Sequence, residues 1–292
     1  MENSANITQI IMDTINSIFE TLFSSIDNNL YSVLDDITFI NSDILHDQNF
    51  ENLFGTSTSN GILLIANSFL LAFILYYATR YLIAHFTYTK TEAPFSFIIK
   101  LVLFGIAMNF SFFLVELFVN INSNVSLAIR NLGENLFHKN ICFSELITTI
   151  NTNVAIDTNS LNVFSLDGLL KGSLTMSLLN LVFSYSLRYI LTKVFILLSP
   201  FAFLSLTLDK TSWFFKAWLR NLFSLLFIQM IVSIVLLILF SMDYSSSNLF
   251  TKFVYVGGIY ALIKTNSIVR DFIGGISTEV SQSVKNFVGF KA

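Results

Sequence analysis

Five stretches of the chain are apolar over lengths suited to crossing a lipid bilayer. They are residues 61–79, 95–119, 169–187, 221–241 and 249–263. At 1.5 Å of rise per residue, about 20 helical residues span the ~30 Å hydrocarbon core of a membrane. The fifth stretch is short, so it must borrow flanking residues or lie deep in a bundle. The pattern predicts an all-α, polytopic membrane helix bundle with about five transmembrane helices.

A sixth apolar stretch, residues 194–208, has only fifteen residues and contains Pro200. Fifteen residues are short for a span, and proline removes a backbone donor where no water can replace it. Irregular backbone at membrane depth is tolerated when protein covers it or when it lines a wet cavity. We therefore expect a re-entrant hairpin, bent near Pro200, that enters and leaves on the same side of the membrane.

Apolar residues also recur at helical spacing outside these stretches. Steps of three and four residues run through 7–37, where the opposite face is acidic and polar, and again through 273–287. The first stripe predicts a surface helix that lies on the membrane or on its own bundle, or one that docks a partner. The expected organisation is an acidic amphipathic segment at 1–60, two spans at 61–119, an outside loop at 120–168, three spans with the hairpin at 169–263, and an amphipathic cytoplasmic tail at 264–292.

Composition agrees with a membrane protein and offers little equipment for catalysis. Hydrophobic types make up 54% of the chain and charged types 12%, about half the charged fraction of a typical soluble domain. The sequence lacks a phosphate-binding P-loop, HExxH and GxSxG. The only cysteine, Cys142, and the three dispersed histidines, His46, His85 and His138, are interpreted as incidental. We expect a protein that is not an enzyme, with no cofactor, catalytic or metal-binding residues.

The distribution of charge predicts the orientation. Residues 1–79 contain nine acids and no Lys or Arg, whereas most basic residues follow in three clusters. The positive-inside rule puts these clusters in the cytoplasm, so we expect an outside N-terminus, a cytoplasmic C-terminus and an odd number of spans in the cytoplasmic membrane.

The densest basic cluster brackets the Pro200 hairpin and includes two tryptophans. One interpretation is a positive-inside anchor with an aromatic belt, and the other is a basic vestibule at the cytoplasmic mouth of a conduit. The residues concerned are Arg188, Lys193, Lys210, Trp213, Lys216, Trp218 and Arg220.

Polar and small residues inside the spans suggest contacts between helices. Asn109, Glu116 and Gln229 are candidates for a polar seam in the bundle, although Glu116 can also extend to the membrane surface. Two pairs of small residues at a spacing of four are candidates for close helix packing. These pairs are Gly168 with Gly172 and Gly257 with Ala261.

The stretch from 187 to 242 resembles a known family. It holds a helix with a basic residue, then the turn Ser199-Pro200-Phe201-Ala202, then an aromatic and basic segment at 213–220 that leads into a strongly apolar span containing Gln229. This order is similar to that of the TrbL-like polytopic inner-membrane subunits of type IV secretion and conjugation systems. The expected topology, with a large outside loop after the second span, also resembles that family.

The resemblance implies a channel or platform subunit that passes single-stranded DNA with its pilot protein, or protein substrates. The implied partners are further copies of the chain, other secretion subunits and their ATPases, and the lipid bilayer. A secondary transporter for a small solute is the alternative, although such transporters often show internal repeats and paired broken helices, and no repeat is evident in this sequence. A membrane scaffold and an intramembrane enzyme fit less well.

Overall fold

The computed structural model describes residues 33–55, 61–90, 93–153, 166–242 and 249–275, together with scattered positions between 10 and 21. Within these ranges the secondary structure is helical and contains no strand. The prediction of an all-α fold is therefore confirmed. Four of the described helices are long and apolar enough to cross a membrane, which supports a multi-pass membrane protein.

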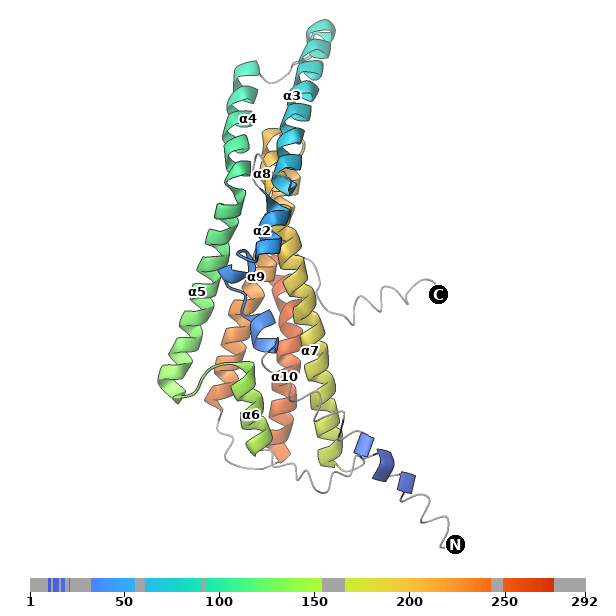
Figure 1. The fold of residues 1–292 in the computed structure, drawn as a ribbon, viewed down its shortest axis with the longest axis vertical. Coiled ribbons are helices and arrows are strands. Elements are labelled where there is room, and N and C mark those ends of the chain that lie inside the picture. Colours follow the sequence, from blue (N-terminus) through green and yellow to red (C-terminus); the bar gives the residue numbers. More distant parts are fainter. Residues whose placement is uncertain are drawn as a thin grey trace.

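The elements follow one another as an elongated bundle (Figure 1). They are η1 (Ser42–Ile44), α2 (Gln48–Phe54), α3 (Ile62–Thr87), α4 (Pro94–Asn109), α5 (Ser111–Phe137), α6 (Phe143–Asn153), α7 (Leu166–Leu197), α8 (Ser199–Leu204), η3 (Ser205–Thr207), α9 (Ser212–Ser241) and α10 (Leu249–Ile273). A further helical turn covers residues 33–38.

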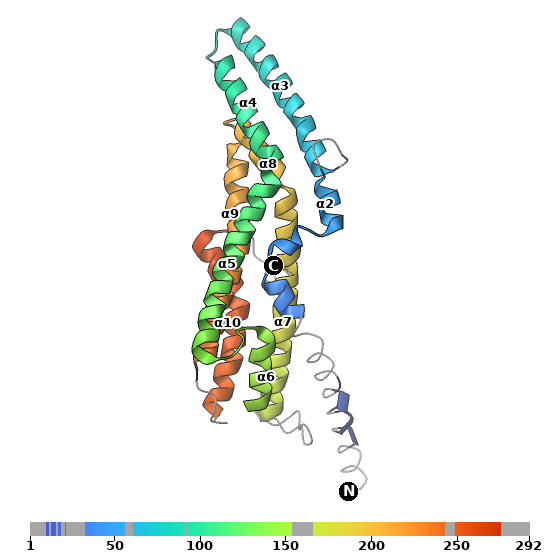
Figure 2. The ribbon, with the colours of Figure 1, turned by 60° about the vertical axis from the view of Figure 1, so that its left-hand side comes forward.

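Helix α9 is the central element of the bundle. It packs against α5 on one side and against α7 and α10 on the other. Beyond Asn221 its sequence is predominantly apolar, as expected for a helix that neighbours cover on several sides. Of its apolar window 56% is buried, against 11% for α3. Helix α3 forms a hairpin with α4 that extends beyond the other helices (Figure 2), so most of its apolar surface is available to lipid.

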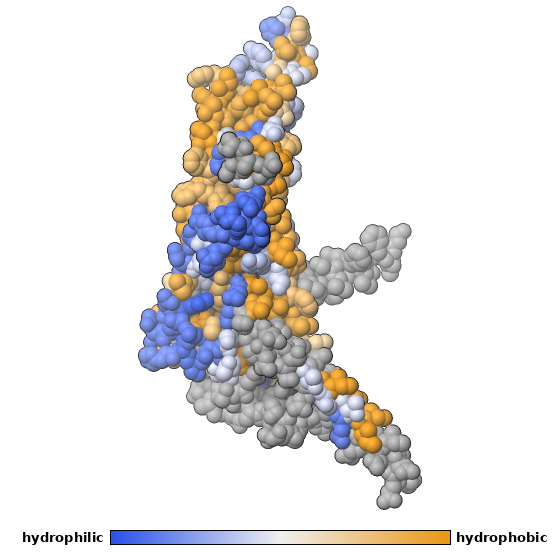
Figure 3. Space-filling model, in the orientation of Figure 1, coloured by the Kyte–Doolittle hydropathy of each residue, from blue (hydrophilic) through white to orange (hydrophobic). Residues whose placement is uncertain are grey.

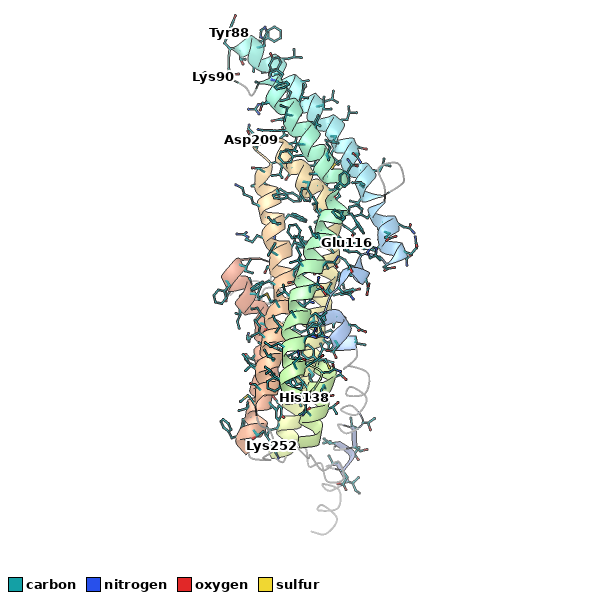
Figure 4. All side chains as sticks on the ribbon, turned by 90° about the vertical axis from the view of Figure 1, so that its left-hand side faces the viewer. Tyr88, Lys90, Glu116, His138, Asp209 and Lys252 are labelled. Atoms are coloured by element: carbon teal, nitrogen blue, oxygen red, sulfur yellow. The ribbon has the colours of Figure 1, made fainter. Side chains whose placement is uncertain are left out.

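The two ends of the bundle differ in the turns they carry. Tyr88, Lys90 and Asp209 lie at the end formed by α3 and α4, whereas His138 and Lys252 lie at the opposite end beside α6 (Figure 4). We call these the α3–α4 end and the α6 end. Residues 88–90 and 208–211 therefore lie at one end and residue 138 at the other.

The second predicted span, 95–119, is part of a much longer rod. Helices α4 and α5 are separated by Phe110 alone (φ −91°, ψ 6°), and the path of the chain bends between them, as Figure 2 shows. At 1.5 Å per residue this rod is about 65 Å long, roughly twice the hydrocarbon thickness of a bilayer. Residues 120–137, assigned to the outside loop, continue α5, and residues 143–153 of the same segment form α6.

The segment around Pro200 is not a separate hairpin with two legs. Helix α7 runs without a break through the end assigned to the third span, residue 187, and ends at Leu197. Pro200 lies in the first turn of α8, where its missing N–H removes no helical hydrogen bond. The bend near Pro200 is present, but the first expected leg belongs to α7, because Tyr189–Leu198 is apolar and contains no helix breaker.

The core consists of two large apolar clusters stacked along α9. One lies toward the α6 end and joins α6, α7, α9 and α10. The other joins the start of α5, the end of α7, α8 and the start of α9. The N-terminal segment contributes Leu34 to the first cluster and Ile40, Leu45 and Phe50 to the second. Residues 33–54 therefore pack on their own bundle, whereas much of the stripe at 7–37 lies outside the described residues. Of the described stripe positions before residue 22, Ile11 and Ile18 are exposed and Ile15 is half-buried.

Two neighbouring glycines of α10, Gly257 and Gly258, lie on different faces of the helix, one exposed and one packed against α9. A Cβ on Gly258 would lie 2.5 Å from Leu239 Cδ2 of α9, whereas a Cβ on Gly257 would meet no atom within 4 Å. The predicted packing pair, Gly257 with Ala261, is exposed on α10, so the close contact uses the neighbouring glycine instead. Gly168 is buried and Gly172 is half-buried on α7.

We expect Gly258→Leu to destabilise the bundle and Gly257→Leu to leave it nearly unchanged. The first substitution forces a side chain into the buried Leu239, and overpacking of this kind typically costs about 1–3 kcal/mol. Thermal unfolding in detergent measures the effect. Equal melting temperatures for the two variants would show that α9 and α10 do not pack as described.

Candidate functional site

Arg188 lies at the junction of the two apolar clusters and is completely buried. Its Nε donates to the Leu225 carbonyl of α9 at 2.9 Å, and its Nη1 donates to the Thr38 carbonyl at 3.0 Å. Its Nη2 makes a longer contact of 3.5 Å with Gln229 Oε1. Among the described residues no acid forms an ion pair with Arg188, so backbone and amide oxygens alone satisfy this guanidinium.

A polar seam runs from Arg188 toward the α6 end between α5 and α9. Asn122 Nδ2 contacts Gln229 Oε1 at 3.5 Å, and one helical turn further on the hydroxyls of Ser126 and Ser233 lie 2.7 Å apart. Buried polar side chains in membrane helices are expected to find such partners, because hydrocarbon offers none. Of the three residues predicted to form a seam, only Gln229 belongs to it.

The other two predicted seam residues contact different parts of the chain. Asn109 exchanges amide contacts of 3.2 and 3.3 Å with Asn67 of α3. Glu116 Oε1 accepts from His46 Nε2 at 3.2 Å, and His46 Nδ1 contacts Glu51 Oε1 at 3.1 Å. The prediction of a single seam through Asn109, Glu116 and Gln229 is therefore wrong.

The N-terminal segment is fixed to the bundle by polar contacts along its length. The Asp35 carboxylate accepts from the backbone N–H groups of Phe143 and Ser144 at 2.8 and 3.1 Å, so it caps the first turn of α6. Arg130 lies over the Phe39 ring at 4.2 Å. Lys193 Nζ lies 3.5 Å from Asp47 Oδ2. Together with the Arg188 and His46 contacts, these interactions join residues 35–51 to α5, α6 and α7.

Sequence reasoning missed Asp35 and His46, because their partners lie about 70 to 110 residues away. Burial of Asp35 raises the pKa of its carboxyl, while the two N–H donors and Arg130 oppose this shift. The pKa of His46 is raised by its hydrogen bond with Glu51 and then by that with Glu116. The charged imidazolium can donate to both carboxylates at once.

The predicted basic vestibule divides into a buried part and an exposed part. Arg188 and Trp218 are interior residues, and Trp218 Nε1 donates to the Phe195 carbonyl in the last turn of α7 at 2.7 Å. These two residues hold the bundle together and are not accessible to a substrate in the single chain. Lys193 is half-buried in its contact with Asp47.

The exposed part lies on the first turns of α9 and on the turn before it. Trp213, Lys216 and Arg220 are spaced by three and four residues, so they share one helical face, and all three are exposed. We call these three residues the α9 basic face. Lys210 is also exposed, in the turn at the α3–α4 end.

The chain matches no protein-family model, no curated protein and no solved structure. Among the described residues no three His, Cys, Asp or Glu side chains are grouped in a way that could hold a metal ion. The four long apolar helices indicate a multi-pass helical membrane protein. In its interior a buried arginine, Arg188, joins α7 to α9 and to the N-terminal segment.

Arg188→Met should loosen the N-terminal segment while the helices stay folded. The Thr38 carbonyl then loses its donor, and an unsatisfied buried polar group costs about 1–3 kcal/mol. Hydrogen exchange at a fixed pH should become faster in residues 33–45 than in the unaltered protein. Lys139→Met, at the exposed α6 end, is the matched control. Unchanged exchange in 33–45 would show that Arg188 does not retain this segment.

The contacts of His46 should weaken as pH rises. The pKa of His46 is raised above its usual 6.5, so the stabilisation by its charged form is complete below pH 6.5 and is lost as pH increases through the raised value. A spin label attached through Asn52→Cys, in a Cys142→Ser background, should become more mobile above that value. His46→Gln should abolish this pH dependence. Label mobility that is independent of pH with His46 present would contradict the assignment.

Proposed function

We propose that this protein is a channel or platform subunit of a type IV secretion machine of the conjugative type, in the cytoplasmic membrane. The observation that carries the proposal is the difference between the two sides of the bundle. On one side α5 exposes Asn124, Asn131 and Asn135 at helical spacing, interspersed with exposed apolar residues such as Leu132 and Leu136. Helices α7 and α10, on the other side of α9, expose mainly large apolar side chains and no comparable row of asparagines among their described residues. The exposed apolar side chains of α7 and α10 include Met176, Phe183, Ile190, Phe253, Tyr260 and Ile268.

The polar side continues past α5 onto the N-terminal segment. Figure 3 shows polar surface over the lower part of α5 and over the region of η1 and α2, and apolar surface over α3 and α4. A lone helix bundle surrounded by lipid would expose apolar residues on all sides. Several copies arranged with their α5 sides together would enclose a polar passage and present apolar sides to lipid, as a translocation channel requires.

The proposed orientation has the α3–α4 end in the cytoplasm. Arg80, Lys90 and Lys210 all lie at that end, and the positive-inside rule favours cytoplasmic placement of such loops. The α9 basic face lies just below it, where an incoming nucleic acid would first meet the subunit. Lysine and arginine attract phosphates without regard to sequence, and an exposed tryptophan such as Trp213 can stack on unpaired bases.

Replacing Lys216 and Arg220 together with Gln should lower conjugative transfer by about tenfold or more, since two phosphate contacts are lost. The matched control is the double change Lys139→Gln and Lys252→Gln at the α6 end, which should leave transfer unchanged. Transfer frequency from the native element is the measurement, with protein level and self-association as checks.

Orientation is checked with single cysteines in a Cys142→Ser background. Lys139→Cys should be labelled from outside whole cells and Lys90→Cys should be protected. If the variant with Lys216→Gln and Arg220→Gln inserts correctly and transfers at the normal frequency, the α9 basic face does not contact the substrate. A gene neighbourhood without conjugation ATPases or a relaxase would favour the secondary transporter instead.

A further inference from the structure

A cavity of about 680 Å³ lies at the α3–α4 end, between α3 and the turn that precedes α9. Its volume falls in the range of small-molecule sites. Aromatic side chains of α3 form one wall, among them Phe69, Phe73 and Tyr76, and Leu208 and Thr211 contribute from the turn. No residue of the α9 basic face is among the described residues that line it.

Three cations line the same cavity: Arg80, Lys90 and Lys210. In the part of the chain that the structure describes, none of them forms an ion pair. Asp209, the one acid among the described lining residues, is paired with Lys100 of α4 at 3.0 Å. The cavity therefore combines an apolar wall with a net positive rim.

Contacts on both sides of the cavity hold its walls in place. Tyr77 stacks on Phe97 of α4 with ring centroids 3.8 Å apart and nearly parallel planes. The Lys100–Asp209 ion pair joins the opposite wall to the same helix α4. Figure 4 also shows that Lys90 and Asp209 lie at the same end of the molecule.

We propose that this cavity binds an anionic phospholipid, with its phosphate at the three cations and an acyl chain along the aromatic wall. Such a ligand fits because it is both apolar and negatively charged, as the cavity requires. Only 11% of the apolar window of α3 is buried, so lipid reaches the cavity directly from the bilayer. Basic pockets between membrane helices are a recurrent way of binding acidic headgroups on the cytoplasmic side.

General attraction between basic loops and acidic lipid would need the charges but not the cavity. The two possibilities are separated by one change that removes charge and one that fills space. Arg80→Gln with Lys210→Gln removes two rim cations. Ala72→Trp places a large ring in the cavity, which Ala72 lines, and retains every charge.

Each variant has a matched control. Lys139→Gln with Lys252→Gln removes two charges at the other end of the bundle. Ala78→Trp adds the same ring to α3 at an exposed position outside the cavity lining.

The measurement is the amount of phosphatidylglycerol retained per protein after exchange in mixed micelles of phosphatidylglycerol and phosphatidylcholine, determined by mass spectrometry. We expect the charge variant and Ala72→Trp each to retain about tenfold less phosphatidylglycerol per protein than the unaltered protein. Both controls should retain as much as the unaltered protein. Inorganic phosphate in a parallel arm should not displace the lipid.

Three results would overturn the proposal. If Ala72→Trp retained as much phosphatidylglycerol as the unaltered protein, the cavity would not be the site and charge alone would attract the lipid. Equal retention of phosphatidylcholine and phosphatidylglycerol would mean that the rim does not select an anionic headgroup. Displacement by inorganic phosphate would make free phosphate the ligand. None of these outcomes depends on secretion, so they are independent of the transfer experiment.

Discussion

The buried guanidinium of Arg188 constrains the rest of the structure. A charged side chain inside a membrane bundle must be surrounded by acceptors, because hydrocarbon supplies none. Helix α9 supplies the Leu225 carbonyl and Gln229, but a guanidinium has five N–H donors, and a further acceptor comes from the Thr38 carbonyl. Arg188 thus links a segment 150 residues earlier in the chain to the middle of the bundle. The two apolar clusters meet at this point, so the contact fixes how the upper and lower parts of the bundle are joined.

This constraint explains why the N-terminal segment is polar on one face and yet packs in the interior. Leu34, Ile40 and Phe50 enter the apolar clusters, while Asp35, Thr38 and His46 provide the polar contacts. The apolar contacts alone would allow the segment to slide along α5 and α7, since apolar burial is not directional. Hydrogen bonds at defined positions remove that freedom. Buried polar groups of this kind are weak sources of stability, and here their geometric role in setting the register of a segment is the better explanation of their presence.

The sequence predicts the parts of this arrangement that depend on local pattern. Apolar runs predict the helical membrane class and the approximate positions of α3, α7, α9 and α10. Local sequence pattern does not predict contacts between segments that are far apart in the chain. Arg188 and Trp218 look like basic and aromatic anchors from their neighbours in sequence, and only packing shows that both are interior. Proline at 200 indicated a break, but not that it starts a new helix without interrupting α7. Helical periodicity identifies which residues share a face, but not which partner covers that face, as Gly257 and Gly258 demonstrate.

The length of the α4–α5 rod has a consequence for how the protein meets its membrane. At about 65 Å it exceeds a ~30 Å hydrocarbon core, so part of the rod must lie in another environment. The apolar hairpin of α3 and α4 suits lipid on all sides. Toward the α6 end, α5 exposes asparagines among apolar residues, while α7 and α10 expose mainly apolar residues. This combination suits neither lipid alone nor water alone. The lateral arrangement of copies that we propose would resolve this conflict, because each surface would then meet the environment that its residues require.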